Sequence, residues 1–173
     1  ADNTFGHAAG MRAIDLAIPL AKEFGIGAIS VSNSSHPGAM ASFALRAARK
    51  GYIAFAFTHA DALLCSHGGK RAYFGTNPIC FGTPTNSKIP FILDTSVSMI
   101  NRGKIRRAAK LGLKIPSGVA LDKSGKPTTN AKKALEGVQL PIASFKGSGL
   151  AWMVDILSGV FTGGNHSGKV KDP

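Results

Sequence analysis

The first third of the chain alternates between helical and extended patterns of apolar residues. Apolar side chains recur at close to helical spacing between positions 11 and 24 and predict a helix over 8–24. Pro19 lies inside this pattern, so we expect it to kink or split the helix, and Gly25 is expected to end it. The unbroken apolar run over 26–31 then predicts a buried strand.

The following segments repeat this order and then change character. Helical spacing returns over 39–50, and an apolar stretch over 52–57 predicts a second strand. Helix, strand, helix and strand in succession are typical of a layered α/β protein. Two further apolar runs, over 79–82 and 90–93, are separated by a short turn, so antiparallel pairing is expected there rather than a repeated β-α-β unit.

The second half of the chain is predicted to be mainly helical. We expect a basic helix over 99–113, a loop over 115–127 and a short helix over 131–135. The long apolar segment over 146–161 predicts a mostly buried helix, packed through Leu150, Met153, Val154, Leu157 and Val160. The polar, glycine-rich tail over 163–173 is expected to be disordered.

The composition fits one domain, or one domain and part of another, of an α/β protein. The chain has 173 residues, of which 44% are hydrophobic. No apolar run is long enough to cross a bilayer, and the first ten residues lack a signal-peptide pattern, so a membrane partner is not expected. Two cysteines, Cys65 and Cys80, do not make a disulfide framework, so a reducing compartment, the cytoplasm, is expected.

The charge adds a question about partners. Twenty-one Lys and Arg residues against nine Asp and Glu give a formal net charge of +12, concentrated over 102–114 and 123–133. This balance favours an anionic partner, which could be nucleic acid, a membrane surface or a phosphorylated cofactor. No aromatic residues interleave with the basic runs as a base-stacking platform would require, so a nucleic-acid partner is not expected. The cations are interpreted as solvated faces, or as facing an acidic segment that this chain does not contain.

One polar turn is a candidate for proton chemistry. Asn33-Ser34-Ser35-His36-Pro37-Gly38 lies between the predicted strand over 26–31 and the predicted helix over 39–50. His36 is the side chain in this turn that is best suited to proton transfer near neutral pH. The alternative is a structural role, in which Ser34 or Ser35 caps the helix and His36 is merely exposed.

Three other turns are suited to binding anions, although no GxGxxG or Walker A motif is present. Gly75, Thr76 and Asn77 offer amides and a hydroxyl. Asp94-Thr95-Ser96 is expected to start a helix, where Asp94 would accept hydrogen bonds from ribose hydroxyls. Lys146-Gly147-Ser148-Gly149 pairs a cation with flexible backbone at a helix start, which favours phosphate; a solvated surface lysine is the alternative for Lys146.

Two other kinds of site are weakly indicated. His59, Cys65, His67 and Cys80 include zinc-ligand types, but their spacing matches no closed structural zinc pattern, so no metal is expected. A Ser66-His67 pair near Asp61 could suggest a hydrolase triad. Because the sequence has no nucleophile elbow and no evident oxyanion turn, we rank this interpretation lower still.

Several motifs occur together in the order and spacing of one enzyme family, from about Gly6 to Gly164. They are Gly25-Ile26-Gly27, Asn33 to Gly38, Gly68-Gly69, Gly75-Thr76-Asn77-Pro78-Ile79, Asp94 to Ser98, Asp122 to Thr129, Lys146-Gly147-Ser148-Gly149-Leu150 and Met153 to Gly159. With these motifs, the chain resembles the malate/L-lactate dehydrogenase family of the non-Rossmann type. Its members include ureidoglycolate dehydrogenase, diketogulonate reductase and sulfolactate dehydrogenase.

The resemblance implies a fold and an activity. The fold would be α/β, with a mixed, largely antiparallel sheet flanked by helices, in which 1–164 form an NAD(P)-binding core domain and 165–173 a polar tail. The activity would be hydride exchange between NAD or NADP and a small 2-hydroxy or 2-oxo acid, in a homodimer. His36 matches the proton acceptor of the ureidoglycolate branch. The positions that match cofactor-binding residues of the family are Ala60, Asp94, Thr95, Ser96, Lys146 and Gly147.

The chain also departs from the family pattern. Family members are longer at both ends, and their N-terminal portion carries a Ser-His-Gly motif whose histidine is the proposed acid/base in other branches. Ser148 stands where the family usually has Tyr, and Asp94 to Ser98 differ from the usual Asp-Met-Ala-Thr-Ser. Two alternatives therefore stay open: an inactive remnant that binds nucleotide or dimerises, and a basic nucleic-acid-binding protein.

Overall fold

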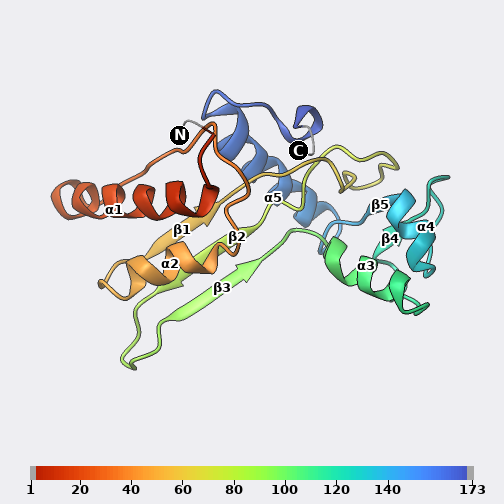
Figure 1. The fold of residues 1–173 in the computed structure, drawn as a ribbon, viewed down its shortest axis with the longest axis horizontal. Coiled ribbons are helices and arrows are strands. Elements are labelled where there is room, and N and C mark those ends of the chain that lie inside the picture. The colour runs from red at the N-terminus through yellow and green to blue at the C-terminus, as the bar shows by residue number, and fades with distance from the viewer. Residues whose placement is uncertain (1–2, 171–173) are drawn as a thin grey trace.

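The computed structural model describes residues 3–170 as two small sheets with five α-helices around them (Figure 1). In chain order, the longer elements are α1 (Gly6–Phe24), α2 (Ala41–Ala48), β1 (Ala54–Phe57), β2 (Ile79–Thr83), β3 (Phe91–Thr95), α3 (Arg102–Lys110) and α5 (Phe145–Asp155). The shorter elements are β4 (Ala120–Leu121), α4 (Ala131–Glu136), β5 (Val138–Gln139), a π-helical turn at Ile156–Val160 and a 3₁₀ turn at Ser167–Lys169.

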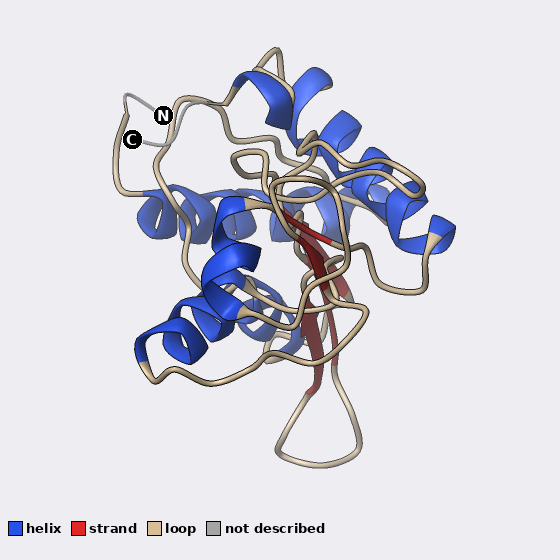
Figure 2. Ribbon diagram, turned by 90° about the vertical axis from the view of Figure 1, so that its right-hand side faces the viewer, coloured by secondary structure: helices blue, strands red, loops and turns tan. Residues whose placement is uncertain are grey.

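The central sheet has the order β1-β2-β3, and both of its pairings are antiparallel. Phe55 pairs with Phe81, which pairs in turn with Leu93, so these three side chains lie on one face of the sheet. The antiparallel pairing predicted from the short turn is therefore confirmed. The loop that joins β2 to β3 projects away from the rest of the molecule (Figure 2).

One face of this sheet is covered by helix α2. Met40, Phe43, Ala44 and Cys80 form a buried cluster, against which Met11 and other side chains of α1 and the sheet pack. The helix and strand approach closely: a Cβ built on Gly82 would lie 2.9 Å from the Cβ of Ala44. Only glycine fits between the two elements without a shift of one of them, so this contact sets the distance between α2 and β2.

The opposite face of the sheet is covered only at one end. Ile79 packs against a cluster of Leu64, Phe74, Val97 and Ala151, the last of which belongs to α5. Beyond Ile79 the face is open: Phe55 is 58% exposed, Phe91 53% and Leu93 48%. Ring contacts link Phe55 to Phe81 and Phe81 to Phe91, so the open part of this face is largely aromatic.

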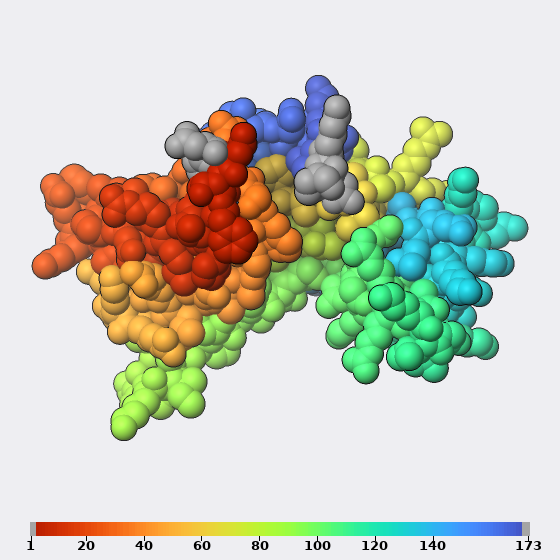
Figure 3. Space-filling view, viewed as in Figure 1, coloured from red at the N-terminus to blue at the C-terminus, as the bar shows by residue number. Residues whose placement is uncertain are grey.

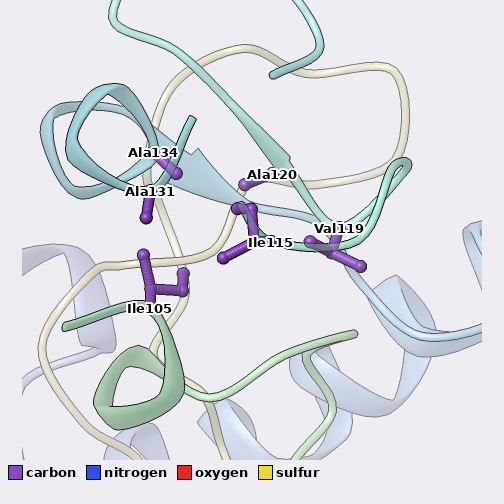
Figure 4. Packing of buried hydrophobic residues seen from close by; sticks show 6 residues of the cluster. All are labelled: Ile105, Ile115, Val119, Ala120, Ala131 and Ala134. Carbon is purple, nitrogen blue, oxygen red and sulfur yellow. The ribbon is translucent and has the colours of Figure 1, made fainter. Parts of the chain in front are cut away.

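Residues 99–140 form a basic lobe at one end of the molecule, shown in green and cyan in Figure 3. It contains α3, α4 and the two-stranded sheet β4-β5, and has a core of its own built from Ile105, Ile115, Val119, Ala120, Ala131 and Ala134 (Figure 4). This lobe carries ten Lys and Arg residues and two acidic residues. Within residues 3–170, none of its cations is in an ion pair. The predicted helices over 99–113 and 131–135 are confirmed, whereas the strands β4 and β5 were not predicted.

In the first third of the chain, one predicted strand is absent and the expected split of the first helix does not occur. The segment 26–31 is extended but forms no strand, and Ile26 is 78% exposed. Its apolar run predicted burial in a sheet, yet no described strand pairs with it, and at Gly27 it lies close against α1. Pro19 does not split α1, which continues through it to Phe24. Since Pro19 is exposed, the carbonyl that loses its donor lies on the solvent side of the helix.

The predicted burial of the helix over 146–161 is also wrong. Of the five side chains expected to be buried, only Val154 is; Leu157 is 41% exposed and Val160 60%. Apolar side chains of α5 lie on more than one side of the helix, but only the side that carries Gly147, Ala151 and Val154 is buried. The sequence pattern alone therefore gave no indication of which side would be covered.

The polar tail is ordered over 165–170, contrary to the expected disorder, while 171–173 lie outside the described residues. Ser167 is fully buried, and both its amide and its hydroxyl donate to the Asp155 carboxylate. The same hydroxyl lies 3.4 Å from Oδ1 of Asn77, whose amide group donates to the Ala151 carbonyl. This buried network ties the tail to α5 and to the Gly75-Thr76-Asn77 turn.

Candidate functional site

Backbone hydrogen bonds bring the three predicted anion-binding turns together. The amide of Val97, just after Asp94-Thr95-Ser96, donates to the Thr76 carbonyl at 2.9 Å. The Val97 carbonyl accepts from Ile142 at 2.9 Å, and the Ile142 carbonyl accepts from Gly147 at 2.9 Å. Residues 75–77, 94–96 and 146–147 are thus neighbours in space although they are up to 72 positions apart in the chain.

Ala60 joins the same group of turns through Gly75. A Cβ on Gly75 would lie 2.7 Å from the Ala60 amide nitrogen and equally close to Oδ1 of Asn77. Glycine at this position therefore lets the two segments touch. Asn77 is fully buried and has φ +37°, and its side chain bonds to Ala151 of α5, so it acts as a structural link rather than as an exposed ligand.

Lys146 and Gly147 lie in the first turn of α5, as predicted. The amide of Phe145, the first residue of this helix, has no backbone acceptor, as expected at a helix start. Lys146 is exposed and forms no ion pair within residues 3–170. Gly147 is buried, and the Ile142 carbonyl lies so close that it leaves no room for a Cβ. Glycine at 147 is thus required by packing. Because the amides of Lys146 and Gly147 already donate to backbone carbonyls, the groups available to an anion are the Lys146 ammonium and the Phe145 amide.

Asp94 and Thr95 end strand β3, and α3 begins only at Arg102, so the expected helix start at Asp94 is wrong. One carboxylate oxygen of Asp94 accepts from the Ala41 amide at 2.8 Å, which supplies the beginning of α2 with an acceptor. Asp94 is itself exposed. The carboxylate thereby connects the end of β3 to the helix that follows His36.

His36 lies in the extended segment before α2 and is exposed. Its Nδ1 accepts a hydrogen bond from the Gly38 amide at 3.1 Å, so in the neutral ring the proton is on Nε2. The proposed capping role of the neighbouring serines is wrong for α2, because Ser35 Oγ instead accepts from Gly6, the first residue of α1. The structure brings His36 near the other candidates only through the Asp94–Ala41 contact, and shows no direct contact with them.

A serine–histidine contact at the start of α5 was missed in the sequence. Ser144 Oγ lies 2.9 Å from Nδ1 of His67, and the His67 amide donates to Ser148 Oγ at 2.6 Å. Ser144 has φ +60° and ψ −121°, a backbone conformation that costs about 1–3 kcal/mol in a residue with a side chain. His67 thus bonds to Ser144 and Ser148 rather than to the Asp61 considered for a hydrolase. Ser144 and His67 are 77 positions apart and match no motif, so the sequence carried no signal for their contact.

The cysteines and the remaining histidines do not form a site. Cys65 and Cys80 are buried free thiols, and within residues 3–170 no group of three or more His, Cys, Asp or Glu side chains is placed to hold a metal ion. Burial, and secondarily the charge of Asp94, raises the pKa of Cys80 to about 11. A thiol with such a pKa is protonated at neutral pH and is therefore a poor nucleophile and metal ligand.

The donor set at the converging turns fits a dinucleotide. A diphosphate requires a cation and a free amide, which Lys146 and the Phe145 amide at the start of α5 offer. Ribose hydroxyls require acceptors, and Asp94 has one carboxylate oxygen that forms no hydrogen bond within residues 3–170. The hydroxyls of Thr95 and Ser96 donate to nearby groups of their own loop but retain acceptor capacity.

Comparison with known proteins identifies the class. The family model described as malate/L-lactate dehydrogenase matches residues 1–173, so the chain belongs to this family. It is 42% identical to (2R)-3-sulfolactate dehydrogenase (NADP(+)) of Chromohalobacter salexigens over 91% of this chain and 47% of that protein. It is 38% identical to malate dehydrogenase of Pyrococcus abyssi over 99% of this chain and 49% of that protein.

Solved structures show the same relationship. The sulfolactate dehydrogenase from Methanocaldococcus jannaschii superimposes with a TM-score of 0.89 at 37% identity, covering 99% of this chain and 52% of that one. The Δ1-piperideine-2-carboxylate reductase from Pseudomonas syringae gives a TM-score of 0.93 at 32% identity, covering 96% and 51%. The family resemblance and the α/β fold class predicted from the sequence are confirmed. The chain spans about half the length of the relatives that it matches.

Proposed function

We propose that this chain forms the NAD(P)-binding core of an oxidoreductase that exchanges a hydride with a small 2-hydroxy or 2-oxo acid. The observation that carries the proposal is the convergence of 75–77, 94–96 and 146–147, three turns whose residue types suit anion binding. Membership in the malate/L-lactate dehydrogenase family supports it. When bound, the nicotinamide ring supplies or accepts the hydride.

The residues of the chain have distinct roles in this proposal. Lys146 and the Phe145 amide hold the diphosphate, and Asp94 accepts from a ribose hydroxyl while it also orders the start of α2. His36, as the tautomer that the Gly38 bond selects, presents Nε2–H to the substrate oxygen. For Nε2 to donate its proton to the substrate, Nδ1 must also carry a proton, because the ring would otherwise be left as an anion. Nδ1 can then no longer accept from the Gly38 amide, so that hydrogen bond must break before the transfer.

Binding is tested by titrating the purified chain with NADH and NADPH and following nicotinamide fluorescence. We expect saturable binding of at least one of them, and about tenfold weaker binding in Lys146→Ala, because a diphosphate loses one charge-assisted contact. Lys132→Ala, in the exposed part of α4, removes the same charge away from the turns and should bind as the unmodified chain does. If neither nucleotide binds while the chain is folded, the proposal is wrong for this chain.

Turnover is tested separately, with pyruvate, oxaloacetate and glyoxylate as 2-oxo acids. His36→Gln keeps a hydrogen-bond donor near the position of Nε2 but cannot transfer a proton, whereas His36→Ala keeps neither. Loss of turnover in both variants, with nicotinamide binding unchanged, assigns proton transfer to His36; residual turnover in His36→Gln alone assigns hydrogen bonding. Equal turnover in His36→Ala and the unmodified chain would remove His36 from the mechanism. Nucleotide binding without any turnover favours the alternative of a binding remnant.

Two further properties complete the proposal. A homodimer is supported by the open aromatic face around Phe55, Phe81 and Phe91, because exposed apolar patches commonly mark protein interfaces. Light scattering of the purified chain should give twice its mass, and Phe55→Lys should shift it toward the monomer.

A cytoplasmic location is supported by the two free thiols. Within residues 3–170, no helix is long and apolar enough to cross a membrane.

A further inference from the structure

A cavity of about 560 Å³ lies beside α5, outside the group of converging turns. The side chains that define it are Lys70, Arg71, Tyr73 and Trp152, together with Ser66. Its size falls in the range of small-molecule sites, about 300–1,000 Å³, and exceeds what a small 2-oxo acid would fill. None of the residues that line it is acidic.

Aromatic rings form one wall of this cavity. Tyr73 lies 5.5 Å from Trp152, centroid to centroid, and Trp152 is 47% exposed. The Tyr73 ring also stacks on the His166 ring, with 5.7 Å between the ring centroids and 15° between the ring planes. An indole with nearly half of its surface uncovered, beside a second ring, offers a planar face on which an aromatic ligand can stack.

These rings are held in place rather than free to collapse into the cavity. Nδ1 of His166 accepts from the Gly168 amide at 3.2 Å, and the adjacent Ser167 is anchored to the buried Asp155. Trp152 also contacts the fully buried Phe74 edge-on at 4.9 Å. The wall is therefore supported by the ordered tail on one side and by the core on the other, which lowers the cost of ordering it on binding.

Two cations lie at the same cavity. Lys70 and Arg71 form no ion pair within residues 3–170. The stem of Lys70 lies against Gly125, where a Cβ would be 2.6 Å from Lys70 Cδ. Because Gly125 has φ +80° in the turn at 122–126, this position is both conformationally and sterically suited to glycine, and the turn supports the lysine. The ammonium and guanidinium groups are available for an anion such as phosphate.

We propose that this cavity binds a nucleoside phosphate, with the base against Trp152 and Tyr73 and a phosphate against Lys70 and Arg71. Stacking rings and two unpaired cations within one cavity match the two halves of such a ligand. The ligand could be the adenosine half of the dinucleotide, in which case the inference rests on the proposed function and the cations select a 2′-phosphate. It could also be a free nucleotide, bound independently of the cofactor turns.

Trp152 is the only tryptophan of the chain, so its quenching by adenosine phosphates, which do not absorb its emission, reports on the surroundings of this side chain. The probes are 5′-AMP, adenosine 2′,5′-bisphosphate and NADPH. We expect saturable quenching of Trp152 by the adenosine phosphates, and about 10–100-fold weaker binding in the double variant Lys70→Ala/Arg71→Ala, because two charge-assisted contacts are lost. Tyr73→Leu should also weaken binding. Lys132→Ala/Lys133→Ala on α4 removes equal charge and is the matched control.

Competition separates the two sources of ligand. If NADPH displaces adenosine 2′,5′-bisphosphate, the cavity takes the adenosine half of the cofactor; if NADPH binds by nicotinamide fluorescence while 5′-AMP stays bound, the site is independent. Absence of quenching by either adenosine phosphate in the folded chain, or equal affinity in the double variant and its control, overturns the inference. Nicotinamide fluorescence is measured in the same samples, so failure at this cavity is distinguished from failure of the cofactor turns. Circular dichroism of each variant confirms that it is folded.

Discussion

The two faces of the β1-β2-β3 sheet differ in their residues and in their surroundings. On one face, Phe43 of α2 is 3% exposed and packs against the fully buried Cys80. On the other, Phe55 and Phe91 are more than half exposed and touch mainly other rings. The alternation of side chains along each strand places these sets on opposite sides. Hydrophobic residues in a strand therefore show that a face can be buried, but not whether this chain covers it.

The largest expected difference between the faces is the cost of removing a ring. Phe43→Ala leaves a cavity in the covered face, so we expect the free energy of unfolding to fall by about 3–5 kcal/mol. Phe55→Ala removes the same ring from the open face and, at dilutions where the chain is monomeric, should cost less than about 1 kcal/mol. Urea unfolding of both variants measures the difference. Equal losses in the two variants would mean that the open face is covered in solution.

A smaller effect is expected from the close approach of α2 and β2. Gly82→Ala forces a methyl group against Ala44 and should destabilise the chain by about 1–3 kcal/mol. Gly149→Ala is the matched control, because a Cβ on Gly149 meets nothing within 4 Å and alanine favours a helix. Thermal unfolding should show a lower midpoint for the first variant and an unchanged or higher one for the second. A stable Gly82→Ala variant would contradict the packing described for this face.

In the monomeric chain, at dilutions below dimer formation, the open face is expected to bind an apolar dye without contributing much to stability. Phe91→Lys should reduce the fluorescence of bound anilinonaphthalene sulfonate, because it breaks the exposed aromatic patch. The free energy of unfolding should change by less than about 1 kcal/mol. Ile89→Lys, at a 78% exposed position in the β2–β3 loop, introduces the same charge outside the strands and is the control. Equal dye binding in both variants would place the dye elsewhere.

The smallest expected effect is at the outer edge of the covered side, where Asp15 of α1 forms a bidentate ion pair with Arg46 of α2 at 2.8 Å. The hydrogen bond from Arg46 holds the pKa of Asp15 below its ordinary value of 3.8. A depressed carboxyl pKa adds stability that is fully present above the unfolded-state pKa and is lost as the pH falls through the folded-state value.

Because this pair is solvent-exposed, the gain is small and weakened by salt. Asp15→Asn should lower the unfolding midpoint slightly at pH 7 and should reduce the loss of stability on acidification below pH about 4. Glu23→Gln, in the last turn of the same helix, has no ion pair within residues 3–170 and is the control. An identical acid profile for Asp15→Asn and the unmodified chain would show that the pair contributes nothing.

Sequence patterns were most accurate where a segment packs against its close neighbours. The helix over 39–50, the strands over 52–57, 79–82 and 90–93, and the basic helix over 99–113 were all predicted at nearly their observed positions. They were wrong for 26–31 and for the outer side of α5, where apolar residues face no partner within the described chain. Periodicity reports which side chains prefer burial, whereas burial itself depends on a second surface.

The candidate site divides in the same way. Residue types and motif order were sufficient to select His36, Asp94 and Lys146 and to indicate the family, because these depend on local chemistry and spacing. Only the tertiary structure showed that Val97 links Thr76 to Ile142, that Ser144 faces His67, and that Lys70 and Trp152 share a cavity. Those contacts join residues far apart in the chain, through backbone bonds and glycine contacts whose geometry is fixed only once the helices and strands have packed.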